Sequence, residues 1–197
     1  MTRRLIILLI AAILCAPAPS ARAAGDAGGG AADGEALWAL LRQGGAIAMM
    51  RHALAPGTGD PPEFRLEDCA AQRNLSEAGR EQARAIGRAF RDRGVPVAGV
   101  LSSRWCRCLE TGRLAFGTVT PFPPLDSFFQ DRSTEPAQTA ALRRFLKAWD
   151  GKGTLVLVTH QVNITALTGV FPQSGEMVVL TRDAAGEVRV AGRLVPG

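Results

Sequence analysis

The chain has 197 residues, of which 47% are hydrophobic and 21% are charged, and its formal net charge is +5 at pH 7. This length suits one domain with a full hydrophobic core. The positive charge is small and scattered, and no basic run carries interleaved aromatic residues, so we expect no nucleic acid among the partners.

The N-terminal segment 1–23 has the layout of a secretory signal peptide. Adjacent arginines precede an apolar run from Leu5 to Ala16, and Ala21-Arg22-Ala23 forms an A-x-A cleavage site. The apolar run is shorter than the ~20 residues that span a bilayer, and the large Leu14 before Cys15 argues against lipidation. We therefore expect an exported, periplasmic or secreted protein without a stable membrane anchor. Removal of the three arginines in this segment lowers the net charge from +5 to about +2.

Three cysteines remain after cleavage: Cys69, Cys106 and Cys108. In an oxidising compartment, this number indicates one disulfide and one free thiol. Cys69 can pair with Cys106 or with Cys108, and the sequence does not choose between them. A zinc site is not expected, because no histidine lies near the Cys106-x-Cys108 pair.

Residues 24–34 are rich in glycine and alanine and predict a flexible leader, which is followed by one domain at 35–197. In that domain the apolar periodicity alternates between helices and strands. Helices are expected at 35–42, 76–93, 106–116, 134–149 and 162–167, and strands at 46–50, 97–101, 118–122, 154–159, 176–181 and 187–194.

Two of these segments decide the fold class. Segment 76–93 begins with Ser76 as an N-cap and carries Ala83, Ile86 and Phe90 at helical spacing. Segment 154–159, TLVLVT, is a continuous apolar strand of the kind that parallel sheets bury on both faces. Alternation of such elements predicts a three-layer α/β/α domain with a largely parallel central sheet, and the last two strands predict a hairpin.

Both histidines of the chain directly follow apolar strands. His52 follows the first strand and His160 follows TLVLVT, and the strand at 97–101 leads into Arg104 and Arg107. Ligands bind at the carboxyl ends of strands in open α/β sheets. Arginine supplies forked donors and histidine acts as a donor or a nucleophile, so this edge predicts a site for a tetrahedral phosphoryl group.

A structural interpretation competes with this one. A lone histidine at a strand end is more often a hydrogen-bonded structural residue than a catalyst. Considered alone, Arg104 and Asp60 are typical of solvated loop residues. The occurrence of both histidines at strand ends, the first of them preceded by Arg51, favours a functional site.

Two other hydrolase classes are excluded by spacing. A cysteine-based phosphatase needs an arginine at a fixed distance after its cysteine, and those positions after Cys69, Cys106 and Cys108 hold Leu75, Gly112 and Leu114. A Ser-His-Asp hydrolase of the nucleophile-elbow type needs G-x-S-x-G, which the sequence lacks.

Four segments, in order, resemble motifs of the histidine phosphatase superfamily, the phosphoglycerate-mutase-like proteins. Arg51-His52-Ala53 resembles its R-H-G signature, and RNLSEAGREQARAIGRAF resembles its L-[ST]-E-x-G-x-x-Q-A helix. SSRWCRCLETG is similar to S-S-P-x-x-R-A-x-Q-T-A, which places Arg107 at the catalytic arginine, and VTHQVNITALTG resembles the second-histidine motif. The resemblance runs from about Gly45 to Leu180.

The chain departs from the family pattern at several positions. Ala53 replaces the usual glycine, Arg104 and Glu110 stand where proline and glutamine are common, and Gln161 follows the second histidine in place of glycine or aspartate. Since R-H-G-x-R-x-P and H-D are both absent, the chain resembles the smaller branch of the superfamily and not the acid phosphatases and phytases.

The resemblance implies a mechanism without a metal or another cofactor. His52 attacks phosphorus and becomes phosphohistidine, while Arg51, Arg107 and His160 hold the equatorial oxygens. The other substrate contacts that it implies are Ala53, Arg104 and Gln161. A carboxylate after the third strand protonates the leaving group; Asp126 is nearest the expected place, with Asp131 and Glu135 as alternatives and Glu176 as a more distant one.

The expected function is therefore hydrolysis of phosphate monoesters. The alternatives are a phosphomutase of the same fold and a non-catalytic binder of phosphorylated envelope glycans. We expect a small phosphorylated substrate, and an envelope sugar phosphate is among those that the resemblance allows. The loop 54–73, rich in glycine, proline and charge, is expected to cover the pocket.

Overall fold

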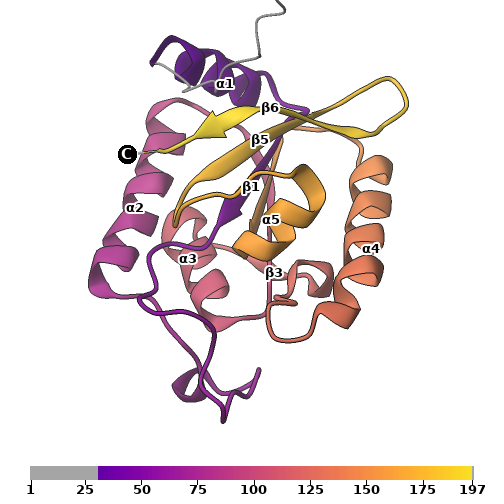
Figure 1. Cartoon of the computed structure of the whole chain (residues 1–197). Coiled ribbons are helices and arrows are strands. Elements are labelled where there is room, and N and C mark those ends of the chain that lie inside the picture. The colour runs from indigo at the N-terminus through magenta and orange to yellow at the C-terminus, as the bar shows by residue number, and fades with distance from the viewer. Residues whose placement is uncertain (1–30, 197) are drawn as a thin grey trace, which may run out of the picture.

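The computed structural model describes residues 31–196 (Figure 1). The expected signal peptide at 1–23 lies outside the described residues. Helix α1 (Ala31–Gln43) begins inside the segment that was expected to be a flexible leader, so residues 31–34 of that segment are helical. Among residues 31–196, no helix is both long enough and apolar enough to cross a membrane.

The described residues form one six-stranded sheet with the order β3-β2-β4-β1-β5-β6. Pairing is parallel from β3 to β1 and antiparallel from β1 to β6, so the sheet is mixed and mostly parallel. The strands are β1 (Ile47–Arg51), β2 (Val97–Ser102), β3 (Thr120–Pro121), β4 (Thr154–Thr159), β5 (Met177–Arg182) and β6 (Val188–Leu194). The predicted fold class and C-terminal hairpin are confirmed.

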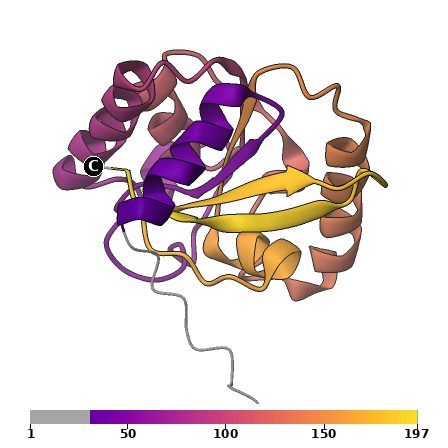
Figure 2. The same cartoon turned by 90° about the horizontal axis from the view of Figure 1, so that it is seen from above.

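Helices cover both faces of this sheet (Figure 2). Alternate side chains of a strand point to opposite faces, and β1 shows the result. Ala48 and Met50 pack into the core beneath α1, α2 and α3, whereas Ile47 and Met49 pack into the core beneath α4 and α5. The helices after α1 are α2 (Glu77–Asp92), α3 (Cys106–Phe116), α4 (Glu135–Ala148) and α5 (Gln161–Thr168).

Helix α2 packs unusually close to the backbone that follows β1. The Ser76 side chain accepts a hydrogen bond from the Gly79 amide at 3.1 Å, which confirms the predicted N-cap. A Cβ atom on Gly79 would lie 2.0 Å from the Leu54 carbonyl oxygen, so only glycine fits there. Glycine at this position therefore lets α2 hold the start of the 54–73 loop against the sheet edge.

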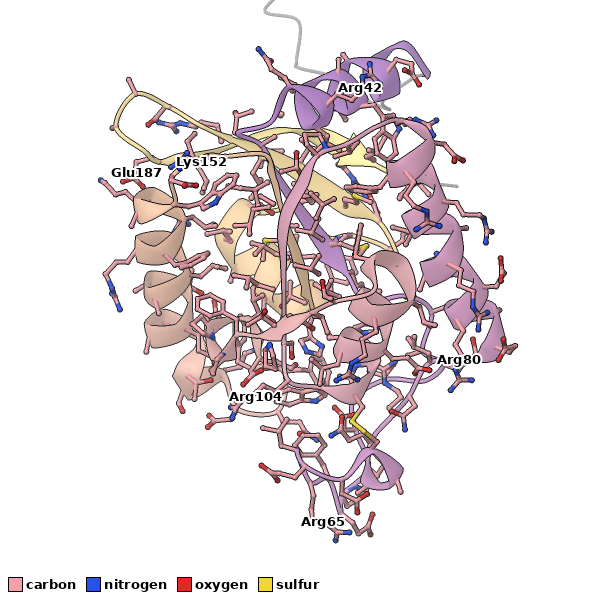
Figure 3. All side chains as sticks on the ribbon, turned by 180° about the vertical axis from the view of Figure 1, so that it is seen from behind. Arg42, Arg65, Arg80, Arg104, Lys152 and Glu187 are labelled. Atoms are coloured by element: carbon pink, nitrogen blue, oxygen red, sulfur yellow. A yellow bond between two sulfur atoms is a disulfide. The ribbon has the colours of Figure 1, made fainter. Side chains whose placement is uncertain are left out.

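The 54–73 loop lies beyond the carboxyl ends of the parallel strands, at the opposite end of the molecule from α1 (Figure 1). A disulfide joins Cys69, in the short 3-10 helix η1 (Cys69–Ala71), to Cys106 at the start of α3. Cys108 is free and buried. The disulfide lies at the same end as Arg104 and Arg65 (Figure 3), so it fastens the loop beside the predicted site.

Loss of this disulfide should lower the free energy of unfolding by about 2–4 kcal/mol, because it restrains a long loop in the unfolded chain. The two cysteines are 37 positions apart. Urea denaturation of the oxidised protein, the reduced protein and a Cys69→Ser/Cys106→Ser variant measures the loss. Reductant should not change the midpoint of the double variant, and an equal midpoint for all samples would contradict the prediction.

Candidate active site

The two histidines are brought together at the carboxyl edge of the central strands. The backbone amide of His52, directly after β1, donates to the Thr159 carbonyl of β4 at 2.9 Å, which extends the strand pairing by one residue. His160 follows Thr159. The two imidazole ring centroids are 5.5 Å apart. Adjacent parallel strands thus place both side chains over one point of the sheet edge.

His52 is a neutral imidazole with a free lone pair. Its Nδ1 lies 2.8 Å from the Ala53 carbonyl oxygen, and this oxygen can only accept, so Nδ1 carries the proton and Nε2 carries the lone pair. The side chain is buried, at 2% exposure. Burial, followed by the positive charge of Arg107, lowers the pKa of His52 to about 3. His52 therefore stays unprotonated at neutral pH, as a nucleophile requires.

His160 is held as the other tautomer. Its Nδ1 accepts a hydrogen bond from Nη2 of Arg107 at 3.4 Å, since a guanidinium can only donate. Nε2 then carries the proton and donates to the Ser103 hydroxyl at 2.8 Å. Ser103 in turn donates to the Asp126 carboxylate at 3.3 Å. Burial and then Arg107 lower the pKa of His160 well below its usual value.

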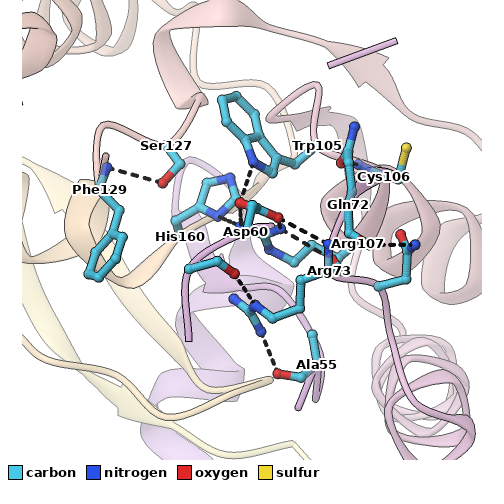
Figure 4. Close-up of polar contacts among 12 residues, drawn as sticks. Ala55, Asp60, Gln72, Arg73, Trp105, Cys106, Arg107, Ser127, Phe129 and His160 are labelled. Atoms are coloured by element: carbon cyan, nitrogen blue, oxygen red, sulfur yellow. Dashed lines mark hydrogen bonds and ion pairs between the residues drawn. The ribbon is translucent and has the colours of Figure 1, made fainter. Parts of the chain in front are cut away.

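Arg107 lies in the first turn of α3 and is almost completely buried, at 2% exposure. It forms a two-armed ion pair with Asp60, with distances of 2.6 Å from Nη1 to Oδ1 and 3.1 Å from Nη2 to Oδ2 (Figure 4). Nη1 also donates to the Arg73 carbonyl at 3.2 Å. The buried Nε of Arg107 has no hydrogen-bond partner among the described residues.

Asp60 and Arg73 lie in the candidate site, although no local pattern in the sequence indicates it. Asp60 is not the solvated loop residue that its glycine- and proline-rich surroundings suggested, because its side chain is only 5% exposed. Arg73 donates from Nε to the Gly59 carbonyl at 2.7 Å and from Nη1 to the Ala55 carbonyl. Burial, with a contribution from Arg107, lowers the pKa of Arg73 to about 10. Both residues come from the 54–73 loop.

Arg51 ends β1 beside a cavity of about 500 Å³. Its Nη1 donates to the Pro172 carbonyl at 3.1 Å, and its buried Nε has no hydrogen-bond partner in the described part of the chain. Burial and the charge of Arg107 lower the pKa of Arg51. The cavity is also lined by Leu54, Ala78, Gln82, Gln173 and Ser174.

Asp126 follows the 3-10 helix η2 (Pro123–Leu125) and is buried at 6% exposure. Arg104 holds it with its backbone amide at 2.8 Å and its side chain, whose Nη2 lies 2.6 Å from Oδ2. Arg104 therefore contacts Asp126, and Ser103 links Asp126 to His160. Of the expected carboxylates, Asp126 is the one joined to a histidine by a chain of hydrogen bonds.

The remaining predicted site residues have other partners. Asp131 is exposed and caps the 3-10 helix η3 (Arg132–Thr134), and Glu135 pairs with Arg132. Glu176 is buried and pairs with Arg193.

The two backbone neighbours of the histidines are also engaged. The Ala53 amide donates to the Thr111 hydroxyl at 3.1 Å, and the Gln161 side chain donates to the Thr165 hydroxyl at 2.8 Å. No group of three or more His, Cys, Asp or Glu side chains within residues 31–196 is arranged to hold a metal ion.

Acid should destabilise the protein partly through His52. In the unfolded chain this histidine takes up a proton below its ordinary pKa of 6.5, whereas in the fold it resists protonation down to about 3. Its contribution to stability is therefore complete above pH 6.5 and is lost as the pH falls towards 3.

Urea denaturation tests this effect by measuring the free energy of unfolding of the wild type and of His52→Asn at pH 6.5 and at a pH about two units below it. The wild type should lose about 2 kcal/mol more than the variant over this interval. Asparagine retains a donor for the Ala53 carbonyl, and His160 and the carboxylates are common to both proteins. Parallel pH profiles for the two proteins would contradict the assignment of a low pKa to His52.

Comparison with known proteins gives a partial match to one family model and a shared fold. Residues 47–126 match the model of the histidine phosphatase superfamily (branch 1). The search of curated proteins found no match.

Similar solved structures include the protein histidine phosphatase SixA complexed with tungstate, with a TM-score of 0.52, 16% identity, and coverage of 77% of this chain and 97% of that one. Another is phosphoserine phosphatase from Entamoeba histolytica in complex with 3-phosphoglyceric acid, with a TM-score of 0.55 and 13% identity. The match covers 76% of this chain and 96% of that one. A third is the mycobacterial glucosyl-3-phosphoglycerate phosphatase Rv2419c in complex with inorganic phosphate, with a TM-score of 0.51 and 18% identity. The match covers 73% of this chain and 93% of that one. At these identities the likeness concerns the fold. The family match spans less than half of the chain and includes His52 and Arg107.

Proposed function

We propose that this protein is a metal-independent phosphatase that hydrolyses phosphate monoesters through a phosphohistidine at His52. The state of His52 carries the proposal. The Ala53 carbonyl fixes Nδ1 of this buried imidazole, and burial, followed by the charge of Arg107, lowers its pKa. Such a site attracts an anionic substrate and keeps its nucleophile unprotonated.

In the proposed reaction, Nε2 of His52 attacks phosphorus as the bond to the leaving oxygen breaks. A water molecule then attacks the phosphohistidine, the N–P bond breaks, and inorganic phosphate leaves. Arg51 and Arg107 stabilise the oxygens of both transition states, and His160 adds a donor only when its N–H leaves the Ser103 hydroxyl. Arg51 and Arg107 each have a buried Nε–H without an acceptor among the described residues, which a phosphoryl oxygen would satisfy.

Asp126 is the proposed general acid for the leaving oxygen. Asp126 is buried, and the Ser103 hydroxyl links it to His160 by two hydrogen bonds. Asp131, in contrast, is exposed, and Glu135 pairs with Arg132. Protonation of a leaving group by a positioned acid typically contributes about 10²–10⁴-fold to the rate.

The ligands of the structural neighbours fit this class of substrate. Tungstate, inorganic phosphate and 3-phosphoglyceric acid, found with those proteins, all carry a tetrahedral oxyanion group. The Cys69–Cys106 disulfide is of the kind that persists in oxidising compartments, which supports export. A small phosphorylated compound of the cell envelope, such as a sugar phosphate, is therefore the proposed substrate.

Release of phosphate from p-nitrophenyl phosphate in EDTA tests the activity. His52→Ala should abolish release, and Arg107→Ala should lower kcat by about 10²–10³-fold, as expected for the loss of one oxyanion donor. Arg113→Ala, an exposed arginine on the same helix, is the matched control and should keep full activity. Full activity in His52→Ala would refute the mechanism, and binding of phosphate without turnover would indicate a non-catalytic binder.

The acid is tested by varying the leaving group. Asp126→Asn should lower the rate on an alkyl phosphate much more than on p-nitrophenyl phosphate, whose phenolate leaves without a proton. Comparison of kcat/KM for both substrates measures the difference, with Asp131→Asn as the exposed control. An equal loss on both substrates would show that Asp126 acts only through its contacts with Ser103 and Arg104.

A further inference from the structure

Asp60 makes the closest contacts to Arg107, and its carboxylate is fully coordinated by donors. Oδ1 accepts from Nη1 of Arg107 at 2.6 Å and from the Arg73 amide at 3.1 Å. Oδ2 accepts from Nη2 of Arg107 at 3.1 Å and from the Trp105 indole at 3.0 Å. Figure 4 shows the carboxylate between Trp105 and Arg107, next to His160. The Asp60 carboxylate thus occupies the position at which the guanidinium of Arg107 and the other donors converge.

The terminal nitrogens of Arg107 have no donor left for a substrate in this arrangement. Each of them carries two N–H groups. Nη1 donates to Asp60 and to the Arg73 carbonyl, and Nη2 donates to Asp60 and to Nδ1 of His160. A phosphoryl group that takes the forked, two-armed contact must therefore replace the carboxylate of Asp60.

We propose that Asp60 is an internal competing anion that makes the site selective for doubly charged phosphoryl groups. This inference rests on the proposed function, since it concerns how the same site chooses its substrate. A phosphate monoester carries two negative charges and gains more from Arg51, Arg73 and Arg107 than the singly charged carboxylate does. A sulfate ester or a phosphodiester carries one charge and gains no such advantage over Asp60.

The backbone around Asp60 confines this exchange to a short segment. Gly57 and Gly59 have φ of +89° and +70°, a conformation that suits glycine, and Pro61 follows Asp60. Beyond this segment, the Cys69–Cys106 disulfide fastens the loop to the residue next to Arg107. Asp60 can therefore leave Arg107 by a change between Gly57 and Pro61, while the rest of the loop stays in place.

Binding of two matched anions without turnover tests the proposal. Phenylphosphonate, at a pH where it is doubly ionised, and benzenesulfonate, which is singly charged, have the same shape and neither contains an ester bond to hydrolyse. Titration calorimetry on the wild type should show phenylphosphonate bound at least about tenfold more tightly. In Asp60→Asn both should bind more tightly, and the preference for phenylphosphonate should fall by about tenfold, because benzenesulfonate gains more.

Asp68→Asn is the matched control, since it removes a negative charge from the same loop at a partly exposed position away from Arg107. It should leave both affinities unchanged. Asp60→Ala provides a second variant if Asp60→Asn unfolds, and thermal unfolding checks both.

Weaker binding of both anions in a folded Asp60 variant would overturn the proposal, because Asp60 would then position Arg107 for the substrate. Unchanged binding would overturn it as well, since Asp60 would then not compete. Neither readout requires catalysis, so a failure of phosphate release in the activity assay is distinguished from a failure of this inference.

Discussion

The buried positive charge of Arg107 is the constraint on which the site depends. A buried guanidinium is costly unless it is paired and hydrogen-bonded. The 54–73 loop supplies that partner, Asp60, from 47 positions away in the sequence. Burial, followed by the same charge, keeps His52 and His160 neutral. The ion pair thus accounts for the loop folding back over the sheet edge, and the charge of Arg107 adds to burial in keeping both histidines unprotonated.

The fold fixes the positions of His52, His160 and Arg107 closely. β1 and β4 are adjacent and parallel, so the residues that follow them, His52 and His160, meet at one edge. Arg107 comes from the first turn of α3, and the neighbouring Cys106 is bonded to the loop that carries Asp60. The covalent link and the ion pair therefore support the same contact between loop and helix.

The sequence predicted the elements well because their signals are local. The buried strand β4 was predicted with the bounds observed, and α2 was predicted within one residue at each end. The pairing of Cys69 with Cys106 depends on a helical turn. In an α-helix of 3.6 residues per turn, positions two apart point in nearly opposite directions. Cys106 therefore faces the loop while Cys108 faces the sheet, with its sulfur 3.7 Å from the Thr159 carbonyl. The sequence predicts this helix but does not show which of its faces meets the loop.

The candidate site shows the same division between local and distant signals. His52, His160 and Arg107 were predicted because they follow the ends of strands. Asp60 and Arg73 lie in a loop without regular periodicity, and only the tertiary structure brings them to Arg107.

The pairing of Asp60 with Arg107 also bears on how the cluster of arginines is stabilised. Burial and then the charge of Arg107 lower the pKa of Arg51 and of Arg73, and Asp60 opposes the repulsion among the three arginines. Replacing one negative charge by the two of a phosphoryl group brings the cluster nearer to neutrality. On the proposed function, a phosphoryl substrate would therefore complete a charge balance that the fold alone leaves unfinished, next to the lone pair of His52.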